Sequence, residues 1–419
     1  MTDAATALPG PRTLVAQTVR VELGDVALEH LLPRQGALAW IRDGDGIVAW
    51  GETARIETTG PNRFADASAW WRRMTGHAVV RDSVDVPGSG LVAFGSFAFG
   101  PSSSALIVPS VVVGRRGDLA WVTTISDSAL VTAPTLRVTD PPTPPRGAVF
   151  SDGSISGAGW ESIVSDATAA IRAGELDKVV LARDLVADLA EPLDVRAPLH
   201  RLAGAYPNCW TFHVDGLFGA TPEMLVRRER GLVMSRVLAG TIRRTGDDEH
   251  DLALAASLAR SSKDLEEHEY AVRSVADALE PSCSSMNVPE APFVLHLPNV
   301  MHLATDVAGV VDPDHEAASA LDLAAALHPS AAVGGTPRAV ALDLIDRLEP
   351  MDRGRYAGPV GWIDADGDGE WGIALRSAEY DGTRVRLFAG CGIVADSDPE
   401  AELAESQAKL VPIRDALSD

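Results

Sequence analysis

The first third of the chain consists of short apolar runs separated by breaks that carry Gly, Pro or Asp. These runs have the length and content of β-strands and span residues 13–22, 36–42, 46–56, 90–99, 105–113 and 118–125. Residues 63–74 instead show helical spacing, with Trp70 and Trp71 as the expected core positions. Because these strands lack a second apolar layer of their own, we expect residues 1–148 to be part of the same fold as residues 149–419.

Beyond the proline-rich stretch at 140–147, strands and helices come in separate runs rather than in regular alternation. The predicted strands span 178–189, 209–215, 223–229, 232–244, 301–311, 358–364, 370–380 and 383–394, with 217–222 as a connection. The predicted helices span 160–173, 250–281, 316–327 and 336–348, and a last helix begins at about 399. This order predicts an α+β fold with large antiparallel sheets.

The composition narrows the class of partner. The chain has 419 residues, 46% of them hydrophobic, and a formal net charge of −23. Such acidity argues against a nucleic acid or an anionic membrane as partner, and an anionic substrate would need a metal ion or a few placed cations. The three cysteines show no metal-ligand spacing, the first residues resemble no leader peptide, and no run of about 18 apolar residues exists. We therefore expect a cytoplasmic protein.

Two predicted helices carry matching acidic pairs beside a buried apolar stripe. Each places two carboxylates one turn apart: Asp264 with Glu267, and Glu402 with Glu405. Four carboxylates at the edge of a core would repel one another unless a cation joined them, and an all-oxygen donor set suits Mg²⁺. Solvated surface charges, including an i,i+4 pair between Glu405 and Lys409, would produce the same spacing. The pattern therefore predicts either a Mg²⁺ site between two helices or two charged helix faces.

Three charged residues stand next to apolar neighbours in predicted strands: Lys178, Glu223 and Arg376. Lys178 could act as a base with a pKa lowered by desolvation, and Glu223 as an acid with a raised pKa. Arg376, in the middle of the strand at 370–380, suits a bound anion or an internal ion pair. A strand-end lysine that reaches water and an acid at a strand edge are the alternatives for Lys178 and Glu223.

Two further motifs resemble known binding loops but lack residues that those loops require. Residues 364–371 imitate a calcium loop, but Leu375 stands where the terminal acid is required, so we predict a tight hairpin turn. Gly390 and Gly392 are too few for a dinucleotide fingerprint, although their backbone amides suit a carboxylate. His302 fits a core position as well as a site.

Several of these segments together resemble the chorismate-utilising enzymes, the family of isochorismate synthase, salicylate synthase and component I of the anthranilate and aminodeoxychorismate synthases. The resemblance covers about residues 150–419 and rests on KVVLAR (178–183), FGATPEMLV (218–226), LAGT (238–241), KDLEEH (263–268), HLAT (302–305), HPSAAVGGTP (328–337), AGCGIV (389–394) and EAELAESQAKL (400–410). It implies two large antiparallel sheets packed together with helices outside, and it makes residues 149–419 the chorismate-binding catalytic region.

The resemblance also implies roles for the candidate residues. Glu267 and Glu405 correspond to direct Mg²⁺ ligands, with Asp264 and Glu402 beside them, and the metal holds the ring carboxylate of chorismate. The residues that correspond to those binding the enolpyruvyl carboxylate are Tyr356, Arg376, Lys409 and the amides around Gly390 and Gly392. Thr241 and His302 correspond to residues that line the ring.

Within this family, the residue at the position of Lys178 separates the nucleophiles, because lysine goes with water and anthranilate synthases carry glutamine. Ala239 replaces the lysine of aminodeoxychorismate synthases, and Ala332-Val333 resembles isochorismate synthases rather than the Thr-Ala of salicylate synthases. We therefore expect an isochorismate synthase, an isomerase in which Lys178 activates water for attack on C2 and protonated Glu223 releases the C4 hydroxyl. A salicylate synthase, which also eliminates pyruvate, and an aminating synthase subunit are the alternatives. We expect a monomer with no obligate glutaminase subunit.

Overall fold

The first of two large β-sheets has 13 strands. The computed structural model describes residues 13–127, 132, 134–297, 300–312 and 318–418, apart from the side chains of Lys263 and Glu267. In sheet order the strands are β10 (Val149–Asp152), β11 (Lys178–Asp188), β23 (Arg384–Ile393), β22 (Ser377–Asp381), β13 (Leu217–Thr221), β12 (Trp210–Val214), β2 (Leu38–Arg42), β3 (Asp45–Trp50), β8 (Val111–Arg116), β9 (Leu119–Ser126), β1 (Val15–Val21) and β5 (Val79–Asp82), with the short β19 (Gly335–Thr336) beside β11.

The second sheet has 10 strands. They are β16 (Cys283–Asn287), β18 (Val300–Val311), β15 (Leu232–Arg243), β14 (Met224–Glu229), β21 (Gly369–Ile373), β20 (Pro359–Asp364), β6 (Val92–Ser96), β7 (Ser104–Val108) and β4 (Ala54–Thr58), with β17 (Phe293–His296) beside β18. The pairing of β1 with β5 is parallel, but the sheets are otherwise antiparallel among the described strands. The predicted α+β fold with two large antiparallel sheets is confirmed.

The N-terminal third contributes strands to both sheets. β2 pairs with β12 in the first sheet, where Ala39 lies opposite His213. β6 pairs with β20 in the second sheet, where Gly95 lies opposite Gly361. Neither sheet is therefore built from the C-terminal part alone, and the boundary at residue 148 stays a prediction.

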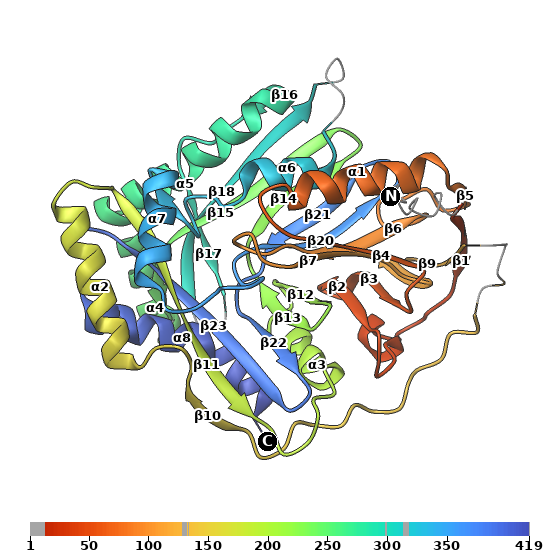
Figure 1. Cartoon of the computed structure of the whole chain (residues 1–419), viewed down its shortest axis with the longest axis horizontal. Coiled ribbons are helices and arrows are strands. Elements are labelled where there is room, and N and C mark those ends of the chain that lie inside the picture. Colours follow the sequence, from red (N-terminus) through yellow and green to blue (C-terminus); the bar gives the residue numbers. More distant parts are fainter. Residues whose placement is uncertain (1–12, 128–131, 133, 298–299, 313–317, 419) are drawn as a thin grey trace, which may run out of the picture.

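Helices cover the outside of the sheets (Figure 1). The first sheet is contacted by α2 (Gly157–Arg172), α3 (Arg196–Ala205) and α8 (Pro399–Leu417), and the second by α1 (Arg63–Gly76), α4 (Asp248–Leu258), α5 (Ser262–Leu279) and α6 (Ala320–Leu327). α7 (Arg338–Leu348) packs on β11 and β19, and two short 3-10 helices are η1 (Leu28–Leu31) and η2 (Glu280–Ser282). Among the helices that the structure describes, none combines the length and apolar character that crossing a bilayer requires.

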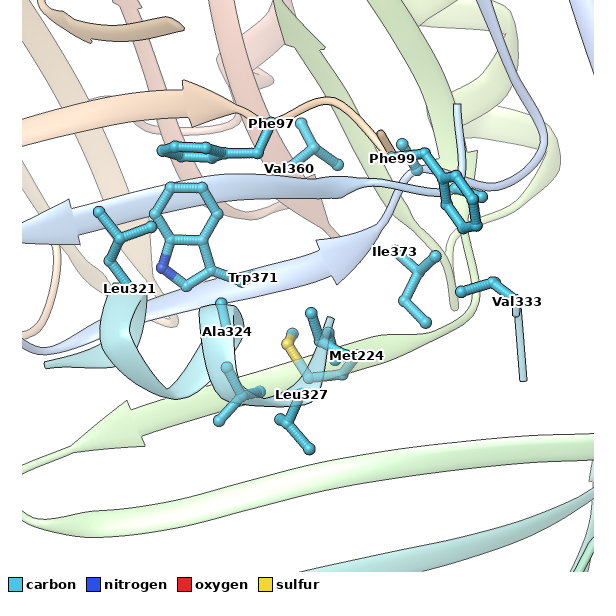
Figure 2. Packing of buried hydrophobic residues seen from close by; sticks show 14 of the residues in the cluster. Phe97, Phe99, Met224, Leu321, Ala324, Leu327, Val333, Val360, Trp371 and Ile373 are labelled. Atoms are coloured by element: carbon cyan, nitrogen blue, oxygen red, sulfur yellow. The ribbon is translucent and has the colours of Figure 1, made fainter. Parts of the chain in front are cut away.

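The core between the sheets is rich in aromatic side chains. Phe97 packs edge-on against Trp371 of β21, with ring centroids 5.6 Å apart. A side chain at Gly95 would meet the Trp371 ring at 2.7 Å, so this close packing requires glycine. Figure 2 shows Phe97 and Trp371 at one end of a buried cluster and Phe99 and Val333 at the other. Val333 also borders the cavity described below.

The chain crosses between the sheets at two adjacent places, and here the structure differs from the sequence-based expectation. Leu217–Thr221, expected as a connection, is strand β13 of the first sheet, and the chain then passes through Glu223 into β14 of the second. The predicted strand at 370–380 is broken, because β21 belongs to the second sheet and β22 to the first. Arg376 lies in this second crossing with a left-handed backbone (φ 48°), so its predicted place in mid-strand is wrong. Apolar alternation carries no information on such a change of sheet.

The predicted helix at 250–281 is two helices, α4 and α5. α4 ends at Leu258, and α5 begins at Ser262. The hydroxyl of Ser261 caps α5 by accepting a hydrogen bond from the backbone N–H of Asp264 at 3.3 Å. The first turn of α5 then places Asp264 against Gly240 of β15.

Candidate active site

A cavity of about 170 Å³ is bounded by residues of both sheets, of α5 and of α8. Its lining includes every predicted site residue whose side chain the structure describes: Lys178, Glu223, Thr241, Asp264, His302, Tyr356, Arg376, Gly390, Gly392, Glu402, Glu405 and Lys409. The remaining candidate, Glu267, belongs to α5, but its side chain lies outside the described part of the structure. Residues that are far apart in the sequence thus form one charged site.

Glu223 and Arg376 reach the cavity from the two sheet crossings. The crossings are hydrogen-bonded side by side, since the N–H of Ile373 donates to the carbonyl of Glu223 at 3.1 Å and that of Ala220 to the carbonyl of Arg376 at 3.2 Å. Glu223 is only 4% exposed. Burial raises its pKa to about 8, against the opposing effects of a backbone hydrogen bond and of nearby positive charges. Its carboxyl group is therefore protonated at neutral pH.

Lys178 opens β11, as the sequence predicts, and is 2% exposed. The strand register places Lys178 opposite Thr336 of β19, and the next residue, Val179, opposite Ile393 of β23. Neighbours on both sides therefore fix the backbone from which the lysine is presented. The positive charge of Lys178 opposes the rise in the pKa of Glu223, so the two side chains are close enough to interact electrostatically.

A β-bulge brings Thr241 opposite His302. Gly240 has a left-handed backbone (φ 76°), and the register between β15 and β18 shifts at this point. The Thr241 hydroxyl lies 3.0 Å from Nδ1 of His302. Burial, together with the positive charges of Arg376 and Lys409, lowers the pKa of His302 to about 3. The imidazole is therefore neutral and can form hydrogen bonds in the cavity without adding charge.

Gly390 lies at the centre of a polar wall. The Lys409 ammonium donates to the Gly390 carbonyl at 2.9 Å. A side chain on Gly390 would lie 3.1 Å from the hydroxyl of Tyr356, so only glycine leaves this wall open. Burial raises the pKa of Tyr356 to about 12 and lowers that of Arg376. Tyr356 is thus a neutral donor, while a guanidinium keeps its charge even when its pKa falls.

The acidic wall is formed by α8. Carboxylate oxygens of Glu402 and Glu405 and Sγ of Cys391 lie within 4.8 Å of one another, and Asp264 of α5 lines the same cavity. Burial raises the pKa of the Cys391 thiol well above its ordinary value, so the hard donors here are the carboxylates. Carboxylates beside an open cavity fit Mg²⁺, which keeps water or substrate oxygens among its ligands. The donor set therefore fits the predicted cofactor.

The lining residues that the sequence analysis did not propose include Phe388 and Arg353. Phe388 stacks on Tyr356, with ring centroids 5.1 Å apart and planes at 11°. Arg353 is 3% exposed and forms an ion pair with Glu349, four residues earlier. A Glu–Arg pair at this spacing is typical of an exposed helix face, so the sequence offers no signal that Arg353 is buried in a site.

A cavity lined by both acidic and basic side chains, with residues from two antiparallel sheets, fits a small charged molecule. The family described as chorismate binding enzyme matches residues 38–418, and the chain belongs to this family. The prediction drawn from the resemblance is confirmed, and with it the prediction of an enzyme. The match begins at residue 38, so it includes most of the N-terminal third, where the sequence motifs were not diagnostic.

Known relatives are similar over most of the chain. The isochorismate synthase MenF of Bacillus subtilis (strain 168) is 32% identical over 403 residues, which cover 88% of this chain and 85% of the relative. The salicylate biosynthesis isochorismate synthase of Pseudomonas aeruginosa is 35% identical over 411 residues, 91% of this chain and 84% of the relative. The solved structure of MenF, the menaquinone-specific isochorismate synthase of Escherichia coli, matches with a TM-score of 0.81 and 28% identity, covering 99% of this chain and 96% of that one.

Proposed function

We propose that this chain is an isochorismate synthase, an isomerase that converts chorismate to isochorismate. The observation that carries the proposal is the presence of buried Lys178 and protonated Glu223 in one cavity of a chorismate-binding enzyme. The relatives named as isochorismate synthases, which are similar over most of the chain, support the same activity here.

In the proposed reaction, water brings a hydroxyl group to C2 of the ring and the hydroxyl group at C4 departs. Lys178 takes a proton from a water molecule whose oxygen bonds to C2. The ring double bonds shift, the C4–oxygen bond breaks, and Glu223 gives its proton to the departing hydroxyl. One water enters and one leaves, so the product is an isomer of the substrate. The raised pKa of Glu223, about 8, supports its role as the acid.

Chorismate carries two carboxylates, and the cavity offers a different wall to each. In the proposal, the enolpyruvyl carboxylate binds Arg376, Tyr356, Lys409 and the amides around Gly390 and Gly392. The planar guanidinium of Arg376 suits this role because it can donate two parallel hydrogen bonds to one carboxylate. Thr241 and His302 contact the ring as neutral hydrogen-bonding groups, a role that their mutual 3.0 Å contact supports.

The ring carboxylate belongs, in the proposal, to the acidic wall. Glu402 and Glu405 of α8, with Asp264 and Glu267 of α5, are the residues that would hold Mg²⁺. When bound, the ion would supply the positive charge that binds and polarises this carboxylate. Without a cation, these side chains would repel an anionic substrate, so the proposal also accounts for the acidity of this wall.

Lys178 and Ala239 support water rather than an amine as the nucleophile. Ala239, on β15, places a methyl group at the cavity where the aminodeoxychorismate synthases carry lysine. Ala332 and Val333 also line the cavity, at the positions where salicylate synthases carry Thr-Ala, and this difference supports isochorismate as the product.

Incubation of the purified chain with chorismate and Mg²⁺, followed by separation of the products, tests the proposal. We expect isochorismate to form without ammonia and without a partner protein. Salicylate and pyruvate, formed without an added lyase, would identify a salicylate synthase instead. An aminated product formed with ammonia would identify an aminating synthase, and failure to convert bound chorismate would contradict all three activities.

A further inference from the structure

We propose that Arg353 and Glu349 form a positioning pair that fixes the strand carrying Lys178 and the cavity wall at Val333. The inference rests on the proposed function and assigns it two further residues. Neither is among the residues that the sequence resemblance supplied, and both lie in the segment between α7 and β20.

The pair fills a gap in the hydrogen-bonding ladder of β11. On the side away from β23, β11 pairs with β19 at Lys178 and Val179 and with β10 from Leu185 onward. Between these strands, the N–H of Val180 still donates to the backbone carbonyl of Gly334 at 2.8 Å. Side chains provide the next partners along β11. The N–H of Ala182 donates to Oε1 of Glu349 at 2.7 Å, and Nη2 of Arg353 donates to the carbonyl of Val180 at 2.6 Å.

The Arg353 guanidinium also binds the loop that contains Val333. Nη1 of Arg353 donates to the carbonyl of Val333 at 2.9 Å, and Nε donates to Oε2 of Glu349 at 2.8 Å. The ring of Phe99 covers the guanidinium, with its centroid 4.2 Å from Cζ. Figure 2 shows Phe99 and Val333 next to each other at the end of the buried cluster. One side chain therefore joins β11, the loop before β19 and the N-terminal third.

The attraction between the charges of Arg353 and Glu349 does not by itself account for this arrangement. Both side chains are almost fully buried, at 3% and 2% exposure, and burying two charges costs about as much free energy as their pairing returns. An apolar pair of similar size would fill the space without this desolvation cost, but it would leave the N–H of Ala182 and the carbonyls of Val180 and Val333 unsatisfied. What an apolar pair cannot supply is the fork of donors and the carboxylate that fix Val180, Ala182 and Val333 relative to one another. Since Lys178 is two residues from Val180, a shift here displaces the proposed base.

The first test compares Arg353→Lys with Arg196→Lys. Arg196 is a matched control, because it is a buried arginine that pairs with Asp194 and donates to a backbone carbonyl, yet it is not part of the described cavity lining. We expect Arg353→Lys to lower kcat by about 100-fold with KM within about threefold, as a misplacement of about 1 Å would. Arg196→Lys should lose similar thermal stability and keep its kcat. Equal kcat values for the two variants would overturn the inference.

The second test separates positioning from folding. The double variant Arg353→Met/Glu349→Leu removes both buried charges but leaves the N–H of Ala182 and the carbonyls of Val180 and Val333 without these partners. We expect it to have a lower melting temperature than the unmodified chain and to keep the low kcat of Arg353→Lys. Return of kcat to the original value would contradict the inference. If this variant does not fold, Glu349→Gln and Glu349→Ala decide, because glutamine can still accept from Ala182 and should retain a several-fold higher kcat than alanine. Equal rates for these two would also contradict it.

Different measurements test the proposed function and the positioning inference. Failure of the proposed function shows in the unmodified chain, as the absence of isochorismate among the products. Failure of the positioning inference shows in the variants, as rates that do not separate Arg353 from Arg196, whichever product of chorismate is measured.

Discussion

Nζ of Lys409 lies 2.6 Å from Oε1 of Glu405, one turn earlier on α8. Burial lowers the pKa of Lys409, but the neighbouring carboxylate outweighs this effect and holds the pKa above its ordinary value. The two residues have different proposed partners, since Glu405 would hold Mg²⁺ and Lys409 a carboxylate of the substrate. Each is thus neutralised by the other until those partners bind.

Lys409→Met should therefore have opposite effects on the two ligands. Removal of the positive charge leaves Glu405 available, so we expect Mg²⁺ to bind several-fold more tightly in calorimetric titration. Chorismate should bind at least about tenfold more weakly, because one charge-assisted hydrogen bond to its carboxylate is lost. Weaker binding of both ligands would show that Lys409 only supports the packing of α8.

Glu405→Ala should abolish activity and Mg²⁺ dependence together. Loss of a carboxylate ligand is expected to lower the apparent Mg²⁺ affinity by about 100-fold or more, as outer-sphere changes alone cost 10- to 100-fold. Calorimetric titration of the variant with Mg²⁺ measures this effect. Glu400→Ala is the control, because Glu400 is an exposed acid in the first turn of the same helix. Normal turnover of Glu405→Ala in the presence of a chelator would remove the metal site from the proposal.

Lys178→Ala should stop the hydration step while leaving chorismate bound. A general base contributes about 100- to 10,000-fold to a rate, so kcat should fall by at least about 100-fold. Equilibrium titration with chorismate should give a Kd within a few-fold of that of the unmodified chain. Complete loss of chorismate binding would instead assign Lys178 to the architecture or to the grip on the substrate.

The acid role of Glu223 predicts a loss of activity at alkaline pH. Its pKa in the folded chain without substrate is about 8, so kcat/KM, which reports the ionisation of the free enzyme, should fall as the pH rises through about 8 and the proton is lost. Glu223→Gln cannot donate this proton and should be nearly inactive at every pH. A profile that stays flat across this region would contradict the assignment of the acid.

The same group predicts a pH-dependent stability. The pKa of Glu223 rises from an ordinary 4.5 to about 8 on folding, so the folded chain binds the proton more tightly than the unfolded chain. This contribution to stability is complete below about pH 4.5 and is lost progressively up to about pH 8. Urea denaturation should therefore show the unmodified chain losing stability relative to Glu223→Gln over this range. A constant difference between the two would contradict the raised pKa.

Local patterns in the sequence predict the elements that carry the site and much of its lining. Lys178 at the start of a strand and the acids of α8 follow from period and spacing within one element. The predicted hairpin at 364–371 is also confirmed, since the Asp364 carboxylate accepts from the N–H groups of Asp366 and Asp368 at 3.0 and 2.9 Å. These features depend on contacts between near neighbours in the chain.

Features that depend on distant contacts could not be predicted in this way. Arg353 bonds to Val180, 173 residues earlier, and Glu349 bonds to Ala182, 167 residues earlier. Their spacing alone is that of an ordinary surface pair. Arg376 likewise sits at a bend that exists only because its two flanking strands belong to different sheets. Neither the buried pair nor the bend at Arg376 can be inferred from the residue pattern within a single helix or strand.

The strand pairs β2–β12 and β6–β20 limit how this chain can be divided. A fragment beginning at residue 149 would carry most of the motifs, but β12 and β20 would become open edges with unsatisfied N–H and C=O groups. Such edges pair readily with other molecules and lead to aggregation. It would also lack Phe99, which covers the Arg353 guanidinium. The motif-bearing segment is therefore not a transferable module, and grafting it onto another N-terminal part would require both strand edges to be matched.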